Sequence, residues 1–332
     1  MSAPLIYAIK KIEDENVLIN VVEMLLSAGA NPNIGGDDGW TPLMWAGSKL
    51  GIVQTLLNVG ADPNIRDNHG QTALLFASKA VNKGCEKIVQ TLLSFGADPN
   101  LADNRANNAL SNASIAGKTK VVQLLLNAGA DPNAKNQVGK TALIHASTKG
   151  HEKIVKLLLD AGADPNIGDN DGFTSLIFAG QNGRGEIVKA LLKAGANINA
   201  RGNNGWNLLM YVTNMGRRKI FQTLMALGSD PNIRDNDGWT PLMYASINGH
   251  GEMVQKLLQA GVDLNSQNRR GETSLILVSQ CGRKDIVQNL LYAGADPNIQ
   301  DNVGHTSLDY AQRYDHKEIV KILLEDEEQD SF

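Results

Sequence analysis

Cysteine and long hydrophobic runs are both scarce in this 332-residue chain. It has two cysteines, Cys85 and Cys281, too few for the disulfide framework of a small secreted domain. No apolar run approaches the roughly 20 residues that a membrane-spanning helix needs. The first residues lack the charged start and long apolar core of a signal peptide. We therefore expect free thiols and an intracellular, cytoplasmic protein, with the nucleus as the other compartment open to it.

The chain also lacks an excess of either charge. Its 31 Lys and Arg residues nearly balance 35 Asp and Glu residues, for a formal net charge of −4. A balance this even gives no overall positive field to hold nucleic acid or an anionic membrane surface. We expect no nucleic-acid binding and no membrane insertion.

Motifs that carry catalysis are missing as well. The sequence contains no His-Glu-x-x-His, no Cys-x-x-Cys and no Gly-x-Ser-x-Gly, the spacings that zinc proteases, redox or metal sites and serine hydrolases need. The six histidines form no metal-ligand pattern. The sequence predicts a protein that is not an enzyme and that has no cofactor and no metal site.

What the chain has in abundance is a repeat. Nine times a leucine-rich run ends in a five-residue element, which in its full form reads Gly-Ala-Asp-Pro-Asn, as at 60–64 and 162–166. Its first glycines are separated by 31, by 36 and then six times by 33 residues. They are Gly29, Gly60, Gly96, Gly129, Gly162, Gly195, Gly228, Gly261 and Gly294. A fixed period of this length indicates a repeat architecture in which each unit packs only on its neighbours.

One unit, at 232–261, shows the local logic most clearly. A turn precedes Gly238, Thr240 has the N-cap preference, and Pro241 suits a first helical turn. A second apolar run with three- and four-residue spacing follows and ends at Gly261. Each unit therefore contains a turn and two helices.

The same unit resembles the consensus of the ankyrin repeat almost position for position. Its Asp-Gly-Trp-Thr-Pro-Leu-Met-Tyr-Ala run, its Gly-His pair and its Leu-Leu-x-x-Gly ending carry the likeness, which extends over the whole chain. The resemblance implies an all-α repeat solenoid, an array of helix-turn-helix units with extended β-hairpin-like fingers. We expect a single domain over 1–332 and a monomer: an N-terminal capping repeat at 1–33, eight internal repeats at 34–298, a C-terminal capping repeat at 299–326 and an acidic tail at 327–332.

Several units depart from the pattern. The second lacks two residues at 46–51, and the third has three extra residues around 80–84. The fourth, at 105–110, has Ala106 where the turn glycine belongs, and because a positive φ strains alanine we expect a different turn there. The first repeat has about five extra residues, which we place in its inter-helix loop at 9–20. These departures are either tuned local shapes or neutral drift.

Two sequence columns vary where the scaffold does not require it. The turn column follows each turn glycine, and the helix column precedes the alanine of each first helix. The turn column reads Trp40, Gln71, Asn107, Lys140, Phe173, Trp206, Trp239, Glu272 and His305. The helix column reads Tyr7, Trp45, Phe76, Asn112, His145, Phe178, Tyr211, Tyr244, Leu277 and Tyr310. All four tryptophans fall in these columns, and aromatic residues commonly anchor interfaces.

The resemblance implies that the turn column faces the concave groove of the array, where relatives bind linear peptides. We predict a protein-interaction scaffold or adaptor that binds a partner protein or an extended peptide there. The predicted contact residues are Trp40, Trp45, Phe173, Phe178, Trp206, Tyr211, Trp239, Tyr244, Lys140, Arg201 and Arg234.

Three alternatives stay open. The rings pack only between repeats; the groove receives a nucleotide or small phosphorylated ligand near Lys140 or Arg201; or the chain is an inhibitory or accessory subunit of a partner enzyme.

Overall fold

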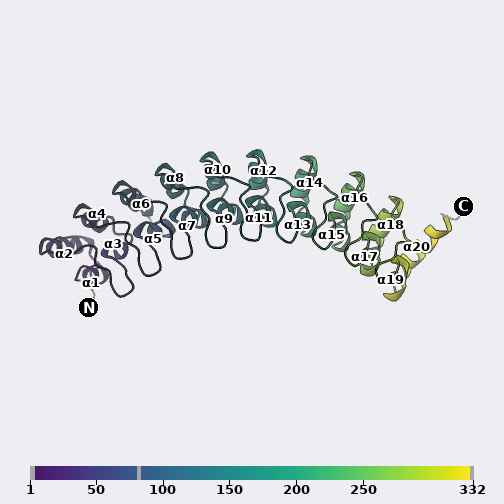
Figure 1. Ribbon diagram of the computed structural model, residues 1–332, viewed down its shortest axis with the longest axis horizontal. Helices are drawn as coiled ribbons and strands as arrows, with labels where there is room; N and C mark the ends of the chain where they lie inside the picture. The colour runs from purple at the N-terminus through teal and green to yellow at the C-terminus, as the bar shows by residue number, and fades with distance from the viewer. Residues whose placement is uncertain (1–3, 81–83, 330–332) are drawn as a thin grey trace. The chain divides into compact units, whose positions relative to one another are not determined.

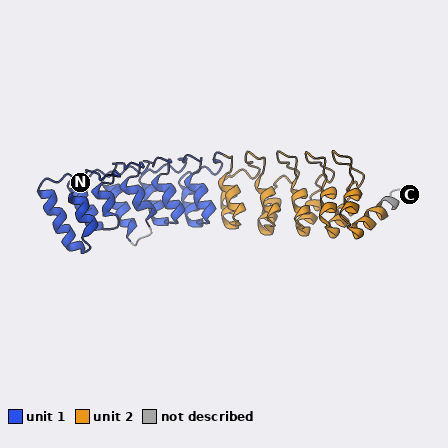
Figure 2. Ribbon diagram, turned by 90° about the horizontal axis from the view of Figure 1, so that it is seen from below, with its two compact units in different colours: residues 1–170 blue, residues 171–332 orange. Residues whose placement is uncertain are grey.

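The computed structural model describes residues 4–80 and 84–329, and these residues form twenty helices with no strand longer than an isolated bridge (Figure 1). Odd-numbered helices are the first helices of the repeats and even-numbered helices are the second. The chain divides into two compact units, unit 1 at 1–170 and unit 2 at 171–332 (Figure 2). The predicted all-helical repeat solenoid is confirmed.

Unit 1 contains five helix pairs. They are α1 (Pro4–Lys11), α2 (Glu15–Ser27), α3 (Pro42–Ala46), α4 (Leu50–Asn58), α5 (Ala73–Lys79), α6 (Cys85–Ser94), α7 (Ala109–Ala116), α8 (Thr119–Asn127), α9 (Ala142–Lys149) and α10 (Glu152–Asp160). Each first helix packs on the next first helix from α1 to α9, and each second helix packs on the next second helix from α2 to α10.

Unit 2 contains the other five pairs. They are α11 (Ser175–Gln181), α12 (Gly185–Lys193), α13 (Leu208–Asn214), α14 (Arg218–Ala226), α15 (Pro241–Ile247), α16 (Gly251–Gln259), α17 (Ser274–Cys281), α18 (Lys284–Tyr292), α19 (Ser307–Arg313) and α20 (Lys317–Gln329). The first helices again stack consecutively from α11 to α19.

Repeat eight forms as its sequence predicts. Gly238 has φ +80°, and the Thr240 hydroxyl accepts a hydrogen bond from the Met243 amide at 3.3 Å to cap α15. On α16 the buried stripe is Met253, Val254 and Leu257. Stacking covers these apolar faces, which one repeat cannot bury alone.

The repeated asparagine of the five-residue element joins neighbouring repeats. The Asn64 side chain accepts from the Asp98 amide at 2.8 Å and donates to the Gly96 carbonyl at 2.9 Å. Asn100 makes the same pair of bonds to Asp131 and Gly129. The amide thus satisfies one backbone donor and one helix-end acceptor of the next repeat, and the element is a structural clamp.

Two sequence expectations about irregular repeats are wrong. The extra residues of the first repeat extend α2, which begins after its N-cap Asp14 and runs for 13 residues, rather than lengthening the loop. The turn of the fourth repeat is not different: Ala106 has φ +59°, and its amide donates to the Asp103 carbonyl at 2.8 Å as the turn glycines do. The turn hydrogen bonds outweigh the strain on the alanine.

Two other irregular segments lie partly outside the described residues. The residues outside the description are 81–83 of the third repeat and 330–332 of the acidic tail. At the C-terminus α20 continues to Gln329, so the backbone of the tail begins as helix.

Candidate interaction surface

The turn column is held in place by the finger that precedes it. In repeat eight the Asp235 carboxylate accepts from the amides of Asp237 at 2.9 Å and Trp239 at 2.8 Å, while the Asp235 amide donates to the Trp239 carbonyl at 3.0 Å. The turn therefore fixes the backbone of the tryptophan just before Thr240 begins the helix. A ring attached to this backbone is preorganised for contact.

In unit 2 the rings of the two columns interleave. Trp206 lies between Tyr211 of its own repeat, at 4.7 Å between ring centroids, and Tyr244 of the next repeat, at 4.6 Å. Trp239 stacks on Tyr244 at 5.2 Å with an interplanar angle of 24°. Trp206 thus contacts the helix-column rings of two repeats.

Phe173 extends this series within unit 2. Its ring contacts Phe178 and Tyr211 edge to face, each at 6.0 Å. The finger of repeat seven has Gly202 where repeat eight has Asp235. A Cβ added at Gly202 would lie 2.2 Å from the Phe173 ring, so the ring occupies the space that a side chain would need. The six rings form one continuous aromatic strip, and all except buried Tyr244 stay partly exposed. The strip consists of Phe178, Phe173, Tyr211, Trp206, Tyr244 and Trp239.

Tyr244 has a second role beneath the strip. Its hydroxyl donates to the Asp235 carboxylate at 2.6 Å, and both side chains are buried. Burial raises the pKa of the Tyr244 hydroxyl well above its usual range, and the bond to Asp235 raises it further. Tyr310 donates to Asp301 at the same distance in the last repeat, and that hydrogen bond raises the pKa of Tyr310 to about 12. These tyrosines connect the helix column to the turn carboxylate.

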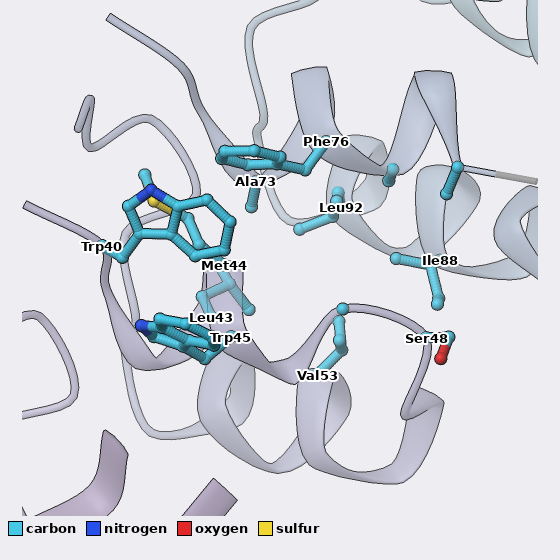
Figure 3. Close-up of a pocket in the computed structure, with 13 residues that line it drawn as sticks. Trp40, Leu43, Met44, Trp45, Ser48, Val53, Ala73, Phe76, Ile88 and Leu92 are labelled. Carbon is cyan, nitrogen blue, oxygen red and sulfur yellow. The ribbon is translucent and has the colours of Figure 1, made fainter. Parts of the chain in front are cut away.

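Unit 1 has a separate aromatic cluster. The Trp40 ring lies 4.7 Å from Trp45 and 4.4 Å from Phe76 (Figure 3). The Lys10 ammonium lies over the Trp45 ring at 3.7 Å, and the Lys79 ammonium over the Phe76 ring at 4.6 Å, both within cation–π range. The sequence singled out Trp40 and Trp45, but it missed the two lysines as ring partners.

The predicted basic contacts have scaffold roles as well. Arg201 donates to its own turn through the Gly205 carbonyl at 2.8 Å and to the Arg234 carbonyl of the next finger. Arg234 likewise donates to the Gln267 carbonyl. Each guanidinium therefore links its own finger to the next one. Both residues also remain exposed, so each keeps a fixed positive charge at the surface.

Lys140 and His145 take the two column positions in repeat five. The histidine is half-buried between charged neighbours. Burial, followed by the positive charges of Lys140 and Lys149, lowers the pKa of His145 to about 4. This repeat therefore presents a lysine and a neutral imidazole where repeats six to eight present rings.

Among the side chains described within residues 4–80 and 84–326, no group of three or more His, Cys, Asp or Glu is arranged to hold a metal ion. No helix in the same ranges has the length and apolar character needed to cross a membrane.

Comparison with models of protein families identifies the family of this chain. A family model of ankyrin repeats matches residues 5–103, 110–202, 201–268 and 252–331. The chain belongs to the ankyrin-repeat family. Ankyrin repeats generally act as protein-interaction modules, and proteins built from them are typically non-enzymatic. A comparison with curated proteins finds no match.

Proposed function

We propose that this ankyrin array is a non-catalytic, monomeric, cytoplasmic scaffold that binds a partner protein or an extended peptide through its turn and helix columns. The aromatic strip of unit 2 is the observation that carries the proposal. Its rings combine large apolar area with partial exposure, which is the character of interface hot spots.

The strip is suited to binding because its rings are already ordered. Trp206 and Trp239 both contact Tyr244, and their turns are held by hydrogen bonds through Asn204 and Asp235. A surface with few rotamers left to freeze loses little entropy when a partner binds. Packed helix layers are spaced by about 8–10 Å and an extended peptide rises about 3.3 Å per residue, so about every third ligand residue meets the turn-column ring of the next repeat.

Fixed charges accompany the strip. Arg201 begins the finger that ends in Trp206, and Arg234 begins the finger that ends in Trp239. Both guanidinium groups are immobilised by the next finger. They favour a partner with carboxylate or carbonyl groups beside its apolar residues. Their engagement with the fingers argues against a role dedicated to the phosphate of a nucleotide.

The test compares two baits in affinity capture from a lysate of the source organism, the wild-type chain and the Trp206→Ala/Trp239→Ala variant. We expect the double variant to lose at least one captured protein, and each single variant to bind that purified protein about tenfold or more weakly.

Tyr292→Ala is the matched control, because Tyr292 is a 97% exposed aromatic residue on the second helix α18, outside both columns. Equal binding by wild type, Trp206→Ala and Trp239→Ala would contradict the proposal. Quenching of tryptophan fluorescence by ATP, lost in the double variant, would favour a nucleotide receptor instead.

A further inference from the structure

Unit 1 contains a cavity of about 260 Å³ where the second repeat is two residues short. It lies between α3 and α5 and reaches the second helices α4 and α6 (Figure 3). The first helix α3 has five residues, whereas α9 of the regular fifth repeat has eight. The last turn of the first helix, which the fifth repeat has, is therefore missing in the second repeat.

The glycine that ends α3 leaves this space open. Gly47 follows Ala46 in the sequence, where Ser78 follows Ala77 in α5 and Ser147 follows Ala146 in α9. Both serines are fully buried, whereas Gly47 is exposed. The second repeat therefore lacks the buried side chain that Ser78 and Ser147 supply at this position.

Other irregular positions in the array are compensated by a neighbour. A Cβ at Gly180 would lie 1.9 Å from Leu208, so that leucine occupies the space of the serine found in other repeats. The shortened second repeat has no such filling, and the cavity remains.

The side chains that line the cavity are apolar apart from that of Ser48. Val53 and Ile88 line one side, and Trp40, Trp45 and Phe76 line the other. The volume lies below the roughly 300–1,000 Å³ of pockets for drug-sized ligands and cofactors. The cavity has room for one large aliphatic side chain, which would gain free energy by leaving water for these apolar neighbours.

The aromatic side of the cavity carries positive charge. Lys10 lies over Trp45, and Lys79 lies over Phe76 while donating to Gln71 at 2.8 Å. In the part of the chain that the structure describes, neither ammonium has a carboxylate within salt-bridge distance. The two charges repel a cationic ligand from these rings and attract carboxylates.

We propose that the cavity between α3 and α5 is a docking pocket for one leucine, isoleucine or methionine side chain from an acidic segment of a partner protein. Carboxylates flanking that side chain pair with Lys10 and Lys79. The inference shares with the proposed function the class of partner and the column positions Trp40, Trp45 and Phe76. It uses other residues than the aromatic strip, so either one can fail while the other holds.

The experiment selects binders from a displayed library of random dodecapeptides against the full-length chain. A graft variant serves for counter-selection: Gly47-Ser48-Lys49 is replaced by Ser-Thr-Lys-Gly-His, the sequence of residues 147–151, which restores the missing helical turn. We expect the selected peptides to carry one aliphatic residue or methionine flanked by Asp or Glu. As synthetic peptides they should bind the graft variant about tenfold or more weakly, as for loss of a buried aliphatic side chain.

Two milder variants keep the test decisive if the graft disturbs folding. Ala80→Leu places a larger side chain at a half-exposed lining position and should weaken binding by a similar factor. Lys10→Gln/Lys79→Gln should weaken binding severalfold and remove much of its salt dependence. Trp206→Ala should leave these peptides unaffected.

Three outcomes overturn the inference. In the first, no peptide survives counter-selection. In the second, the selected peptides bind wild type and Ala80→Leu equally. In the third, they are basic, which would indicate a cation site on the rings. Peptides that depend on Trp206 and Trp239 but not on the graft would support the proposed function and refute the pocket.

Discussion

Gln137 and Ala106 face each other across the contact between two neighbouring fingers. At the equivalent point most fingers place an asparagine opposite a glycine. The Gln137 backbone amide donates to the Arg105 carbonyl at 3.0 Å, and its side chain donates to the Asn104 carbonyl at 2.7 Å. At the equivalent contact of the next finger, a Cβ on Gly139 would lie 2.5 Å from the Asn170 side chain. The longer glutamine accompanies the one alanine in this turn position.

We predict that Gln137→Asn destabilises the chain by about 1–2 kcal/mol, because the shorter amide is drawn against the Ala106 methyl group. The midpoint of urea unfolding, followed by circular dichroism, measures the effect. Adding Ala106→Gly should recover most of the loss, with a coupling energy of about 1 kcal/mol. Additive effects of the two substitutions would show that the pair is not compensatory.

A second pair joins repeats six and seven. Gly180 lies in α11, and Leu208, at the start of α13, occupies the space where its side chain would be. Gly180→Ser restores the residue found in most other repeats, yet we predict that it destabilises the chain by about 1–3 kcal/mol through overpacking. Denaturant unfolding tests this, and Leu208→Ala should cost less stability in the Gly180→Ser background than in wild type. A stabilising effect of Gly180→Ser would contradict the prediction.

These pairs mark the limit of what the sequence alone predicts. The cap at Thr240 and the glycine turn at Gly238 depend on a few neighbouring residues, so the spacing of the repeat was enough to predict them. The turn at Ala106 was predicted wrongly, since its strain is offset by hydrogen bonds to Asp103 and by the partner across the next finger.

The candidate surface also has features that the sequence predicts and features that it does not. The register placed Trp206 and Trp239 in one column, but the contact of Trp206 with Tyr244 depends on the rotation of the next repeat. The gap at 46–51 was visible in the sequence, whereas the cavity was not. Whether neighbours collapse into a deleted turn is decided by packing in three dimensions.

The hydrogen bond between Tyr244 and Asp235 gives a third prediction. Tyr244→Phe leaves a buried carboxylate oxygen without its donor, so we expect a loss of about 1–3 kcal/mol in stability. Tyr211→Phe is the matched control in the preceding repeat. There Gly202 replaces the aspartate, and the hydroxyl has only a 3.3 Å contact with Asn204. The control should change stability by less than about 0.5 kcal/mol; equal losses would show that the carboxylate contact contributes nothing specific.

The lowered pKa of His145 gives a prediction about pH. Burial, together with Lys140 and Lys149, favours the neutral imidazole in the folded chain and lowers its pKa from 6.5 to about 4. The unfolded chain therefore binds more protons than the folded chain between these values. The contribution of this group to stability is complete above about pH 6.5 and is lost as the pH falls toward 4, by roughly 1–3 kcal/mol.

Urea unfolding of wild type and His145→Asn between pH 4 and 7 measures that loss, because asparagine stands naturally at this column position as Asn112. The variant should show a smaller decline in stability across the window. Titration of the imidazole by NMR should also show a higher pKa in Lys140→Gln, since one of the repelling charges is removed. An ordinary pKa for His145 in the folded wild type, or identical pH profiles for wild type and His145→Asn, would refute the prediction.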